Sequence, residues 1–306
     1  MLCRAQRHPG AASFGALAVL LGVLAPVWLA MALLPDLASL RPQGVAKLEQ
    51  RFAQRGYDLA AVSANRAAVP RLFLKILPAD WGRVSDAGRR KELFLLATLP
   101  LILRENERVL SDRRRLLALR DRLAGGGWPS RRDRAWLSGL AANYGLAGAD
   151  LSRLLRRVDA VPVSLALAQA AVESGWGTSR FAVEGNALFG QWTAEGGHAM
   201  TPRARAADFS HAVRRFGTLS GSVAAYLSNL NRHPAYRAFR RRRAELRALG
   251  RPPSGGALAA TLTAYSQRGT DYVSVLRQVM AENDLGRFDS ARLARPRGAA
   301  APSERD

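Results

Sequence analysis

Residues 162–177 read PVSLALAQAAVESGWG and carry the clearest structural signal in the chain. Its opening proline suits the first turn of a helix, and no helix breaker follows until Gly175 and Gly177 arrive together. The run between them is almost wholly apolar, so it predicts a buried helix from Val163 to Ser174. Glu173 stands near its end, where a carboxylate adjoins apolar surface and an aromatic residue.

Such surroundings favour the neutral form of Glu173 and predict a pKa raised toward the range that a general acid needs near neutral pH. The leaving oxygen of a sugar is poor unless it is protonated, and a glutamate with a raised pKa is the usual donor. The residues alone leave a second interpretation equally open, in which Glu173 caps a helix or forms a surface ion pair.

Longer strings on both sides of this helix resemble a known family, the bacterial endo-β-N-acetylglucosaminidases of the flagellar-muramidase and autolysin type. The strings that carry the resemblance are residues 168–177, 179–181, 186–192, 226–236 and 265–272. The longer of these strings, together with residues 69–77 and 100–103, are similar to the Bax branch of that family. The resemblance therefore covers most of the chain beyond its first 35 residues.

The resemblance implies a mainly α-helical, lysozyme-like catalytic domain with a small β-hairpin lobe. Its cleft would hold the alternating polymer of N-acetylglucosamine and N-acetylmuramic acid. Glu173 matches the catalytic acid of the family, and Tyr265 matches a tyrosine that the family places in the cleft. Tyr272 matches a second tyrosine of the same motif, and Asn186 and Phe189 match the segment that closes the helix against the cleft.

Two tryptophans, Trp176 and Trp192, are candidates for stacking on sugar faces. Simple packing is the alternative for Trp192, Tyr265 and Tyr272, because large aromatic side chains commonly bury their rings in a core.

A second carboxylate is less clear. Some members of the family use a glutamate of the hairpin lobe, where this chain offers Glu195 and Asp208, and we favour Asp208. An inverting reaction needs two carboxyl groups about 6.5–9.5 Å apart, whereas substrate-assisted retention needs only one. The sequence leaves both reactions open.

Other functions fit less well. A lytic transglycosylase also uses one glutamate in a Glu-Ser string, but the Gly-Trp-Gly and Asn-x-Leu-Phe-Gly continuations argue against it. A non-catalytic peptidoglycan-binding protein of the envelope would keep the cleft without turnover. A basic protein that binds membrane surfaces or nucleic acid would show binding that collapses with salt and does not depend on Glu173.

We expect no metal and no cofactor. The only cysteine is Cys3, and the histidines lack the spacing of a zinc site. No glycine-rich phosphate loop is present, and Ser174 lacks the preceding glycine of a nucleophile elbow.

The net charge of +22 predicts anionic surroundings without choosing among them. Arg240 to Arg243 form the one true basic run, which we interpret as a solvated helix face or a contact with anionic lipid or wall polymer. The expected partners are peptidoglycan glycan strands and the cytoplasmic membrane, and no nucleic acid is expected.

Residues Ala11 to Leu34 carry no charged side chain, and basic residues precede them. A span of roughly 20 apolar residues crosses a bilayer, so the length favours a retained anchor with the rest of the chain outside the cytoplasm. The protein is expected to face the periplasm from the inner membrane. It would be periplasmic if cleavage occurs near Ala30-Met31-Ala32.

The chain divides into four expected segments, namely 1–35 as the signal or anchor, 36–157 as a helical accessory region, 158–290 as the glucosaminidase domain and 291–306 as a disordered tail. The predicted helices outside Val163 to Ser174 include an apolar stretch from Leu93 to Leu123 broken at Pro100, then residues 222–231, 234–249 and 257–265, and a last helix that Thr270 caps.

Overall fold

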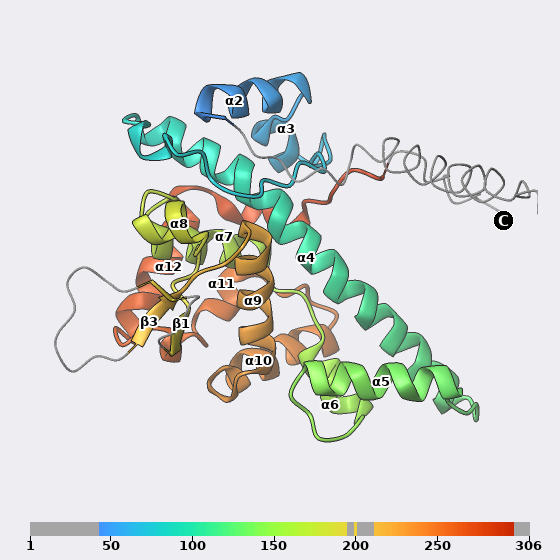
Figure 1. Ribbon diagram of the computed structural model, residues 1–306. Coiled ribbons are helices and arrows are strands. Elements are labelled where there is room, and N and C mark those ends of the chain that lie inside the picture. The colour runs from blue at the N-terminus through green and yellow to red at the C-terminus, as the bar shows by residue number, and fades with distance from the viewer. Residues whose placement is uncertain (1–42, 195–198, 201–210, 297–306) are drawn as a thin grey trace, which may run out of the picture. The chain divides into compact units, whose positions relative to one another are not determined.

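The computed structural model describes residues 43–194, 199–200 and 211–296, which belong to one compact unit (Figure 1). The expected anchor at Ala11 to Leu34 lies outside these residues. None of the helices within the described ranges is both long and apolar enough to cross a membrane.

The described part is mainly helical, as expected. Its α-helices are α2 (Val45–Gln54), α3 (Leu59–Ser63), α4 (Ala87–Ala124), α5 (Arg131–Asn143), α6 (Leu151–Arg157), α7 (Val163–Ser174), α8 (Arg180–Gly185), α9 (Leu219–Arg232), α10 (Arg237–Ala248), α11 (Gly255–Ala259) and α12 (Thr270–Glu282). The short 3-10 helices are η2 (Trp81–Arg83), η3 (Pro234–Tyr236), η4 (Thr263–Tyr265) and η5 (Leu285–Ser290).

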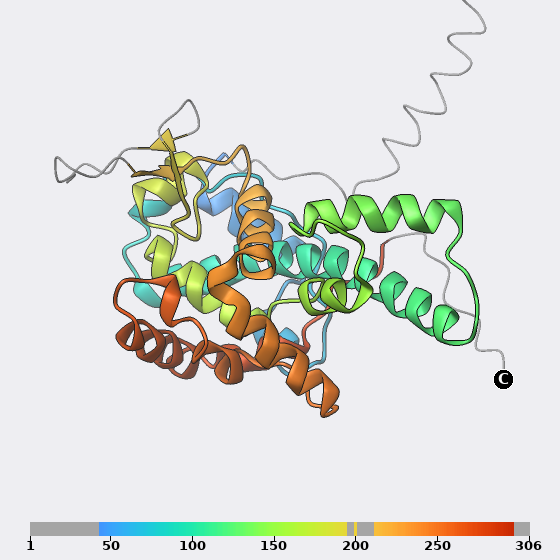
Figure 2. The same ribbon diagram turned by 90° about the horizontal axis from the view of Figure 1, so that it is seen from below.

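Helix α4 is the long axis around which the other elements pack. Helices α2 and α3 lie beside its first half, and α5 and α6 lie near its far end (Figures 1 and 2). Asp86 caps its start by accepting a hydrogen bond from the Arg89 amide.

The expected break at Pro100 is wrong, because α4 continues through it as one 38-residue helix. Every residue from Leu93 to Leu103 is buried. A large apolar side chain contributes about 1.5–3 kcal/mol when buried. The burial of this whole segment therefore stabilises the helix by more than the roughly 3 kcal/mol that an interior proline costs.

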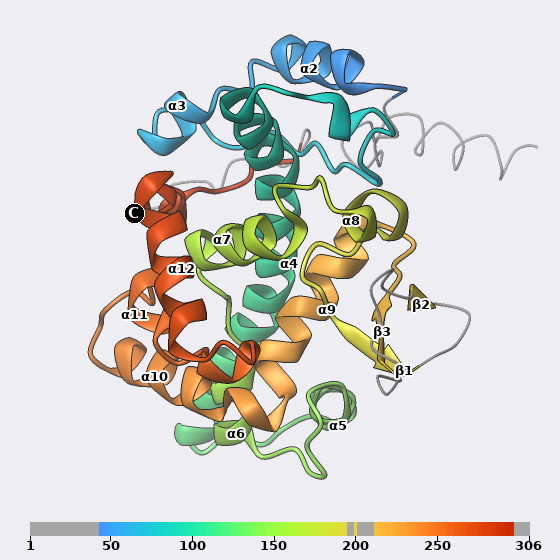
Figure 3. The ribbon, with the colours of Figure 1, turned by 90° about the vertical axis from the view of Figure 1, so that its left-hand side faces the viewer.

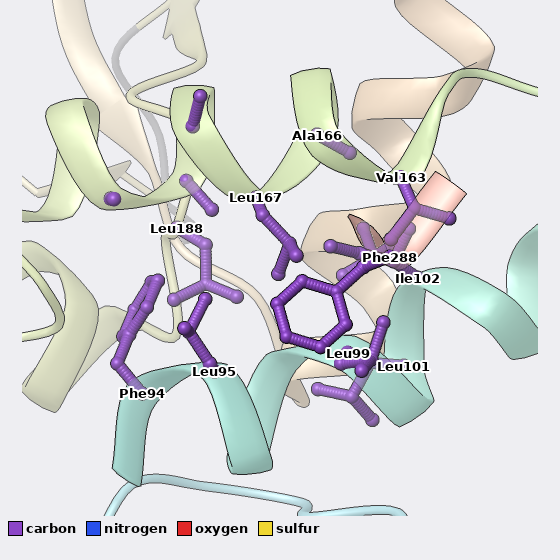
Figure 4. Close-up of a cluster of buried hydrophobic side chains, with 14 of the residues drawn as sticks. Phe94, Leu95, Leu99, Leu101, Ile102, Val163, Ala166, Leu167, Leu188 and Phe288 are labelled. Carbon is purple, nitrogen blue, oxygen red and sulfur yellow. The ribbon is translucent and has the colours of Figure 1, made fainter. Parts of the chain in front are cut away.

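Helix α7 lies across α4, between α12 and α9 (Figure 3). Leu167 of α7 points toward α4 near Leu95 and Leu99, and Phe288 of η5 fills the space beside them (Figure 4). The start of α7 is fixed by Asp289, which accepts hydrogen bonds from the amide and the hydroxyl of Ser164. The sequence prediction of a buried helix over these residues is confirmed.

One hydrophobic cluster runs through both the accessory and the catalytic segments. It joins Phe52, Trp81 and Phe94 to Leu167 and Leu276. The expected boundary between residues 157 and 158 therefore does not coincide with a gap in the core. A smaller cluster holds α5 and α6 against the far end of α4.

A small antiparallel sheet lies beyond α9 and has the strand order β1-β3-β2. Its strands are β1 (Trp192–Ala194), β2 (Ala199–Met200) and β3 (His211–Arg214). Thr193 pairs with Ala212, and Met200 pairs with Val213. The segments that connect these strands, where the predicted lobe carries Glu195 and Asp208, lie outside the described residues.

Two later predictions differ from the structure. The expected helix over residues 257–265 is split into α11 and η4, and the Thr261 hydroxyl donates to the Leu258 carbonyl at 2.7 Å between them. Such side-chain bonds compete with the helical pattern. Leu293, which lies within the expected disordered tail of residues 291–306, is buried and forms a β-bridge with Val69.

The basic run on α10 is only half solvated. Arg240 and Arg243 are buried, whereas Arg241 is exposed. Arg240 donates to the carbonyls of Leu230 and His233 at the end of α9. The interpretation of the run as a solvated face is therefore wrong for these two arginines, because they satisfy carbonyl groups that a helix end leaves unpaired.

Candidate active site

Glu173 lies in the last turn of α7 and is half-buried. Burial raises the pKa of its carboxyl group above the ordinary value, and a hydrogen bond with the Tyr272 side chain lowers it by a smaller amount. The net direction is upward because loss of hydration disfavours the charged form. Glu173 is thus able to hold a proton at a higher pH than an exposed glutamate.

The hydrogen bond from Tyr272 has a direction that its neighbours determine. Gln169, one turn before Glu173 on α7, donates its amide N–H to the Tyr272 hydroxyl oxygen at 3.0 Å. The amide oxygen of Gln169 accepts from the Tyr226 hydroxyl at 2.7 Å. Because the Tyr272 oxygen already accepts from Gln169, its own proton is available for donation to Glu173.

Further tyrosine rings surround this chain of hydrogen bonds. Tyr265 stacks in parallel on Tyr272 with ring centroids 5.6 Å apart, and Tyr236 packs against Tyr265 at 5.9 Å. The charge of Glu173 raises the pKa of all four tyrosines, after the larger effect of burial on each. The carboxyl group therefore sits among hydroxyl groups that stay protonated and neutral.

The segment after α8 closes the other side of Glu173. Phe189 is buried and stacks on Tyr226 at 3.9 Å, and its carbonyl accepts a hydrogen bond from the Tyr265 hydroxyl at 3.1 Å. Gly190 has a φ of +57°, and a Cβ at this position would lie 3.1 Å from Glu173 Oε2. The backbone thus approaches the carboxylate closely where only glycine fits without strain.

The structure brings together Glu173, Tyr265, Tyr272 and Phe189 of the residues that the sequence singled out. Asn186 lies apart from them. It is buried at the end of α8 with a left-handed φ of 52°, and it donates to the Phe216 carbonyl at 2.9 Å. It therefore fastens α8 to the segment that follows β3.

The ring of Trp176 lies against α4. It meets the ring of Phe94 edge-on at 5.7 Å, and the ammonium group of Lys91 lies 5.2 Å from its centroid. The backbone of Trp192 belongs to β1, but its side chain is not among those described, and Glu195 and Asp208 are outside the described residues. No cluster of three or more His, Cys, Asp or Glu within the described ranges is placed to hold a metal ion.

Sequence reasoning did not assign a role to Gln169, Tyr226 or Tyr236. Gln169 carried a usable signal, because a polar side chain inside an apolar helix needs a hydrogen-bonding partner when it is buried. The two tyrosines carried no such signal, since their approach to Glu173 depends on how α9 and η3 pack against α7.

Comparisons with known proteins place the chain in a family. Residues 149–285 match the family described as Glucosaminidase, mannosyl-glycoprotein endo-beta-N-acetylglucosaminidase. Protein bax of Escherichia coli (strain K12) is 34% identical over 210 residues, which are 67% of this chain and 73% of that protein. No solved structure matches the chain.

Proposed function

Because this chain belongs to the glucosaminidase family and is Bax-like, we propose that it is an endo-β-N-acetylglucosaminidase of peptidoglycan. In this proposal it cleaves the β-1,4 bond between N-acetylglucosamine and N-acetylmuramic acid. The observation that carries the proposal is Glu173, a half-buried carboxyl group with a raised pKa among protonated tyrosine hydroxyls.

In the proposed mechanism, Glu173 donates its proton to the glycosidic oxygen as the bond to the sugar breaks. The Tyr272 hydroxyl then donates to the carboxylate that this transfer leaves behind. Tyr265 shapes the cleft through two contacts. Its hydroxyl donates a hydrogen bond to the Phe189 carbonyl, and its ring stacks on the ring of Tyr272.

Two routes complete the reaction. Water attacks the sugar with the help of a second carboxylate, for which we propose Asp208 before Glu195. Alternatively, the acetamido group of the substrate attacks the anomeric carbon as the glycosidic bond breaks, and water then opens the cyclic intermediate to give the reducing end. We further propose that the protein is exported and reaches the wall polymer from the outer face of the cytoplasmic membrane, as the apolar segment before residue 35 indicates.

The test is digestion of purified peptidoglycan by the full-length protein in mild detergent, beside Glu173→Gln. We expect the wild type to release reducing N-acetylglucosamine ends, identified by mass spectrometry. The variant should be slower by roughly the 10²–10⁴ that a general acid contributes. Glu282→Gln is the matched control, since this glutamate is exposed on α12 and should leave the rate unchanged.

Three outcomes would contradict the proposal. Anhydro-muramic ends would identify a lytic transglycosylase instead. Binding of glycan strands without turnover would identify a non-catalytic wall protein. Salt-sensitive binding that is equal for wild type and Glu173→Gln, with no release of glycan ends by the wild type, would identify a basic surface-binding protein.

A further inference from the structure

The turn that follows α7 has an unusual backbone. Gly175, Trp176 and Gly177 have consecutive φ angles of 58°, 56° and 82°. The left-handed region suits glycine, but it crowds the Cβ of any other residue. Trp176 therefore holds a strained conformation directly after the helix that carries Glu173, and such strain persists only where the surrounding structure enforces it.

The enforcing contacts come from the segment that precedes the catalytic region. The buried Trp81 indole N–H donates a hydrogen bond to the Trp176 carbonyl oxygen at 3.0 Å. Phe94 and Lys91 of α4 both contact the Trp176 ring. A Cβ on Gly177 would lie 2.7 Å from Trp81 Nε1, so this turn and Trp81 pack as closely as glycine allows.

The turn is bonded back to the last turn of α7. The Trp176 amide donates to the Ala171 carbonyl at 2.9 Å, and the Gly177 amide donates to the Ser174 hydroxyl at 2.9 Å. The same hydroxyl donates to the Ala170 carbonyl at 2.5 Å. Any displacement of the Trp176 peptide is thus transmitted to the helical turn that contains Glu173.

We propose that Trp81, held by the accessory helices, is a positioning residue that sets the orientation of Glu173 through the Gly175 to Gly177 turn. If Trp81 has this role, the accessory region contributes to the geometry of the active site. Trp81, Lys91 and Phe94 all precede residues 149–285, which are the residues that match the glucosaminidase family. The expected effect on kcat rests on the proposed function, whereas the expected effect on the orientation and titration of Glu173 does not.

The kinetic test compares full-length wild type with Trp81→Phe, which removes the N–H donor and keeps an aromatic ring. We expect kcat on peptidoglycan to fall by about tenfold to a hundredfold, the usual effect of a misplaced catalytic group, while KM stays within about twofold. Phe52→Leu is the matched control, because Phe52 is buried in the same core on α2 and lies away from the turn. It should lower thermal stability and leave kcat unchanged.

A second readout does not require activity. Titration of the Glu173 carboxyl carbon by NMR, assigned with Glu173→Gln, should show its pKa falling toward the ordinary value in Trp81→Phe, because a loosened turn admits water. Phe52→Leu should leave this titration unchanged. If the wild type proves inactive, the proposed function fails and the titration alone decides the inference.

The inference is overturned if Trp81→Phe keeps both kcat and the Glu173 titration. It is also overturned if Phe52→Leu changes them as much. Where Trp81→Phe folds poorly, Lys91→Met keeps Trp81 and removes the cation from the Trp176 ring. That variant should show a smaller fall in kcat with unchanged KM, and an unchanged kcat there would count against the proposal.

Discussion

At the scale of single residues, the chemistry of the site depends on whether the Tyr272 hydroxyl donates or accepts its hydrogen bond with Glu173. Its oxygen accepts from Gln169, and its proton is directed to Glu173. A donor aimed at a carboxylate stabilises the charged form and lowers the pKa. Burial has the larger effect and raises the Glu173 pKa overall, so Tyr272 limits the rise that burial causes.

Tyr272→Phe should therefore raise the pKa of Glu173 further, because it removes the one effect that favours the ionised form. A general acid works while it is protonated, so the alkaline limb of the pH–rate profile should move to higher pH. The variant also leaves the Gln169 amide without its acceptor, which should cost about 1–3 kcal/mol of stability. Rates on peptidoglycan from pH 4 to 9 and denaturant unfolding measure both effects.

The control for this substitution is Tyr57→Phe. The Tyr57 hydroxyl is buried and has no hydrogen-bonding partner among the described residues, and burial raises its pKa. Its removal should leave the pH–rate profile unchanged and the stability equal or higher. An alkaline limb that stays in place, or moves to lower pH, in Tyr272→Phe would contradict the assigned hydrogen bond.

The same residues mark the limit of prediction from the chain alone. Glu173 was predictable because an apolar helix, a double glycine and a tryptophan adjoin it in sequence. The tyrosines near its carboxyl group were not predictable, because Tyr226 and Tyr272 bond to Gln169 from positions 57 and 103 residues away in the sequence. No local pattern encodes such contacts.

At the scale of elements, a buried ionic cluster joins α4 and α10 to the segment between α6 and α7. Asp159, between α6 and α7, is bonded by Arg247 of α10 and lies near Arg243 of α10 and Arg113 of α4. Burial raises the pKa of Asp159, but the hydrogen bond from Arg247 and the charges of Arg243 and Arg113 together lower it below the ordinary value. Burial lowers the pKa of Arg243 to about 10.

Asp159→Asn should destabilise the fold by about 3–5 kcal/mol near pH 7, because it leaves buried arginines without their counter-charge. A carboxyl whose folded pKa is lowered contributes stability above its ordinary pKa and loses it as the pH falls through the folded pKa. The difference between wild type and variant should therefore shrink in acid. Denaturant unfolding at pH 7 and pH 3 measures it.

Asp121→Asn is the matched control, since Asp121 pairs with Arg120 on the exposed surface of α4. It should change stability by no more than about 0.5 kcal/mol. An equal loss in the two variants would show that the buried cluster has no special role.

Two members of this cluster, Arg243 and Arg247, had a signal in the sequence. They recur with Arg240 at helical spacing beside Phe239 and Leu246.

At the scale of the whole molecule, helix α7 shares one hydrophobic core with the accessory region. The α7 side chains that lie opposite the tyrosines pack on the apolar centre of α4, which belongs to the accessory region (Figure 4). A fragment limited to residues 149–285 lacks this surface. It should show no cooperative thermal transition, whereas residues 43–296 should unfold in one step.

Circular dichroism on heating compares the two fragments, with the full-length protein as reference. A sharp transition in the short fragment would show that the family-matched residues fold alone.

The sequence by itself determined what depends on neighbours along the chain. It specified the buried helix from Val163 to Ser174 with Glu173 near its end, the mainly helical class and the family, because helical periodicity, glycine pairs and motif strings are local. Only the tertiary structure decided that α4 passes through Pro100, that Arg240 and Arg243 are buried, and that Trp81 holds the turn after Glu173. Those features arise from contacts between distant segments, whose burial outweighs local preference.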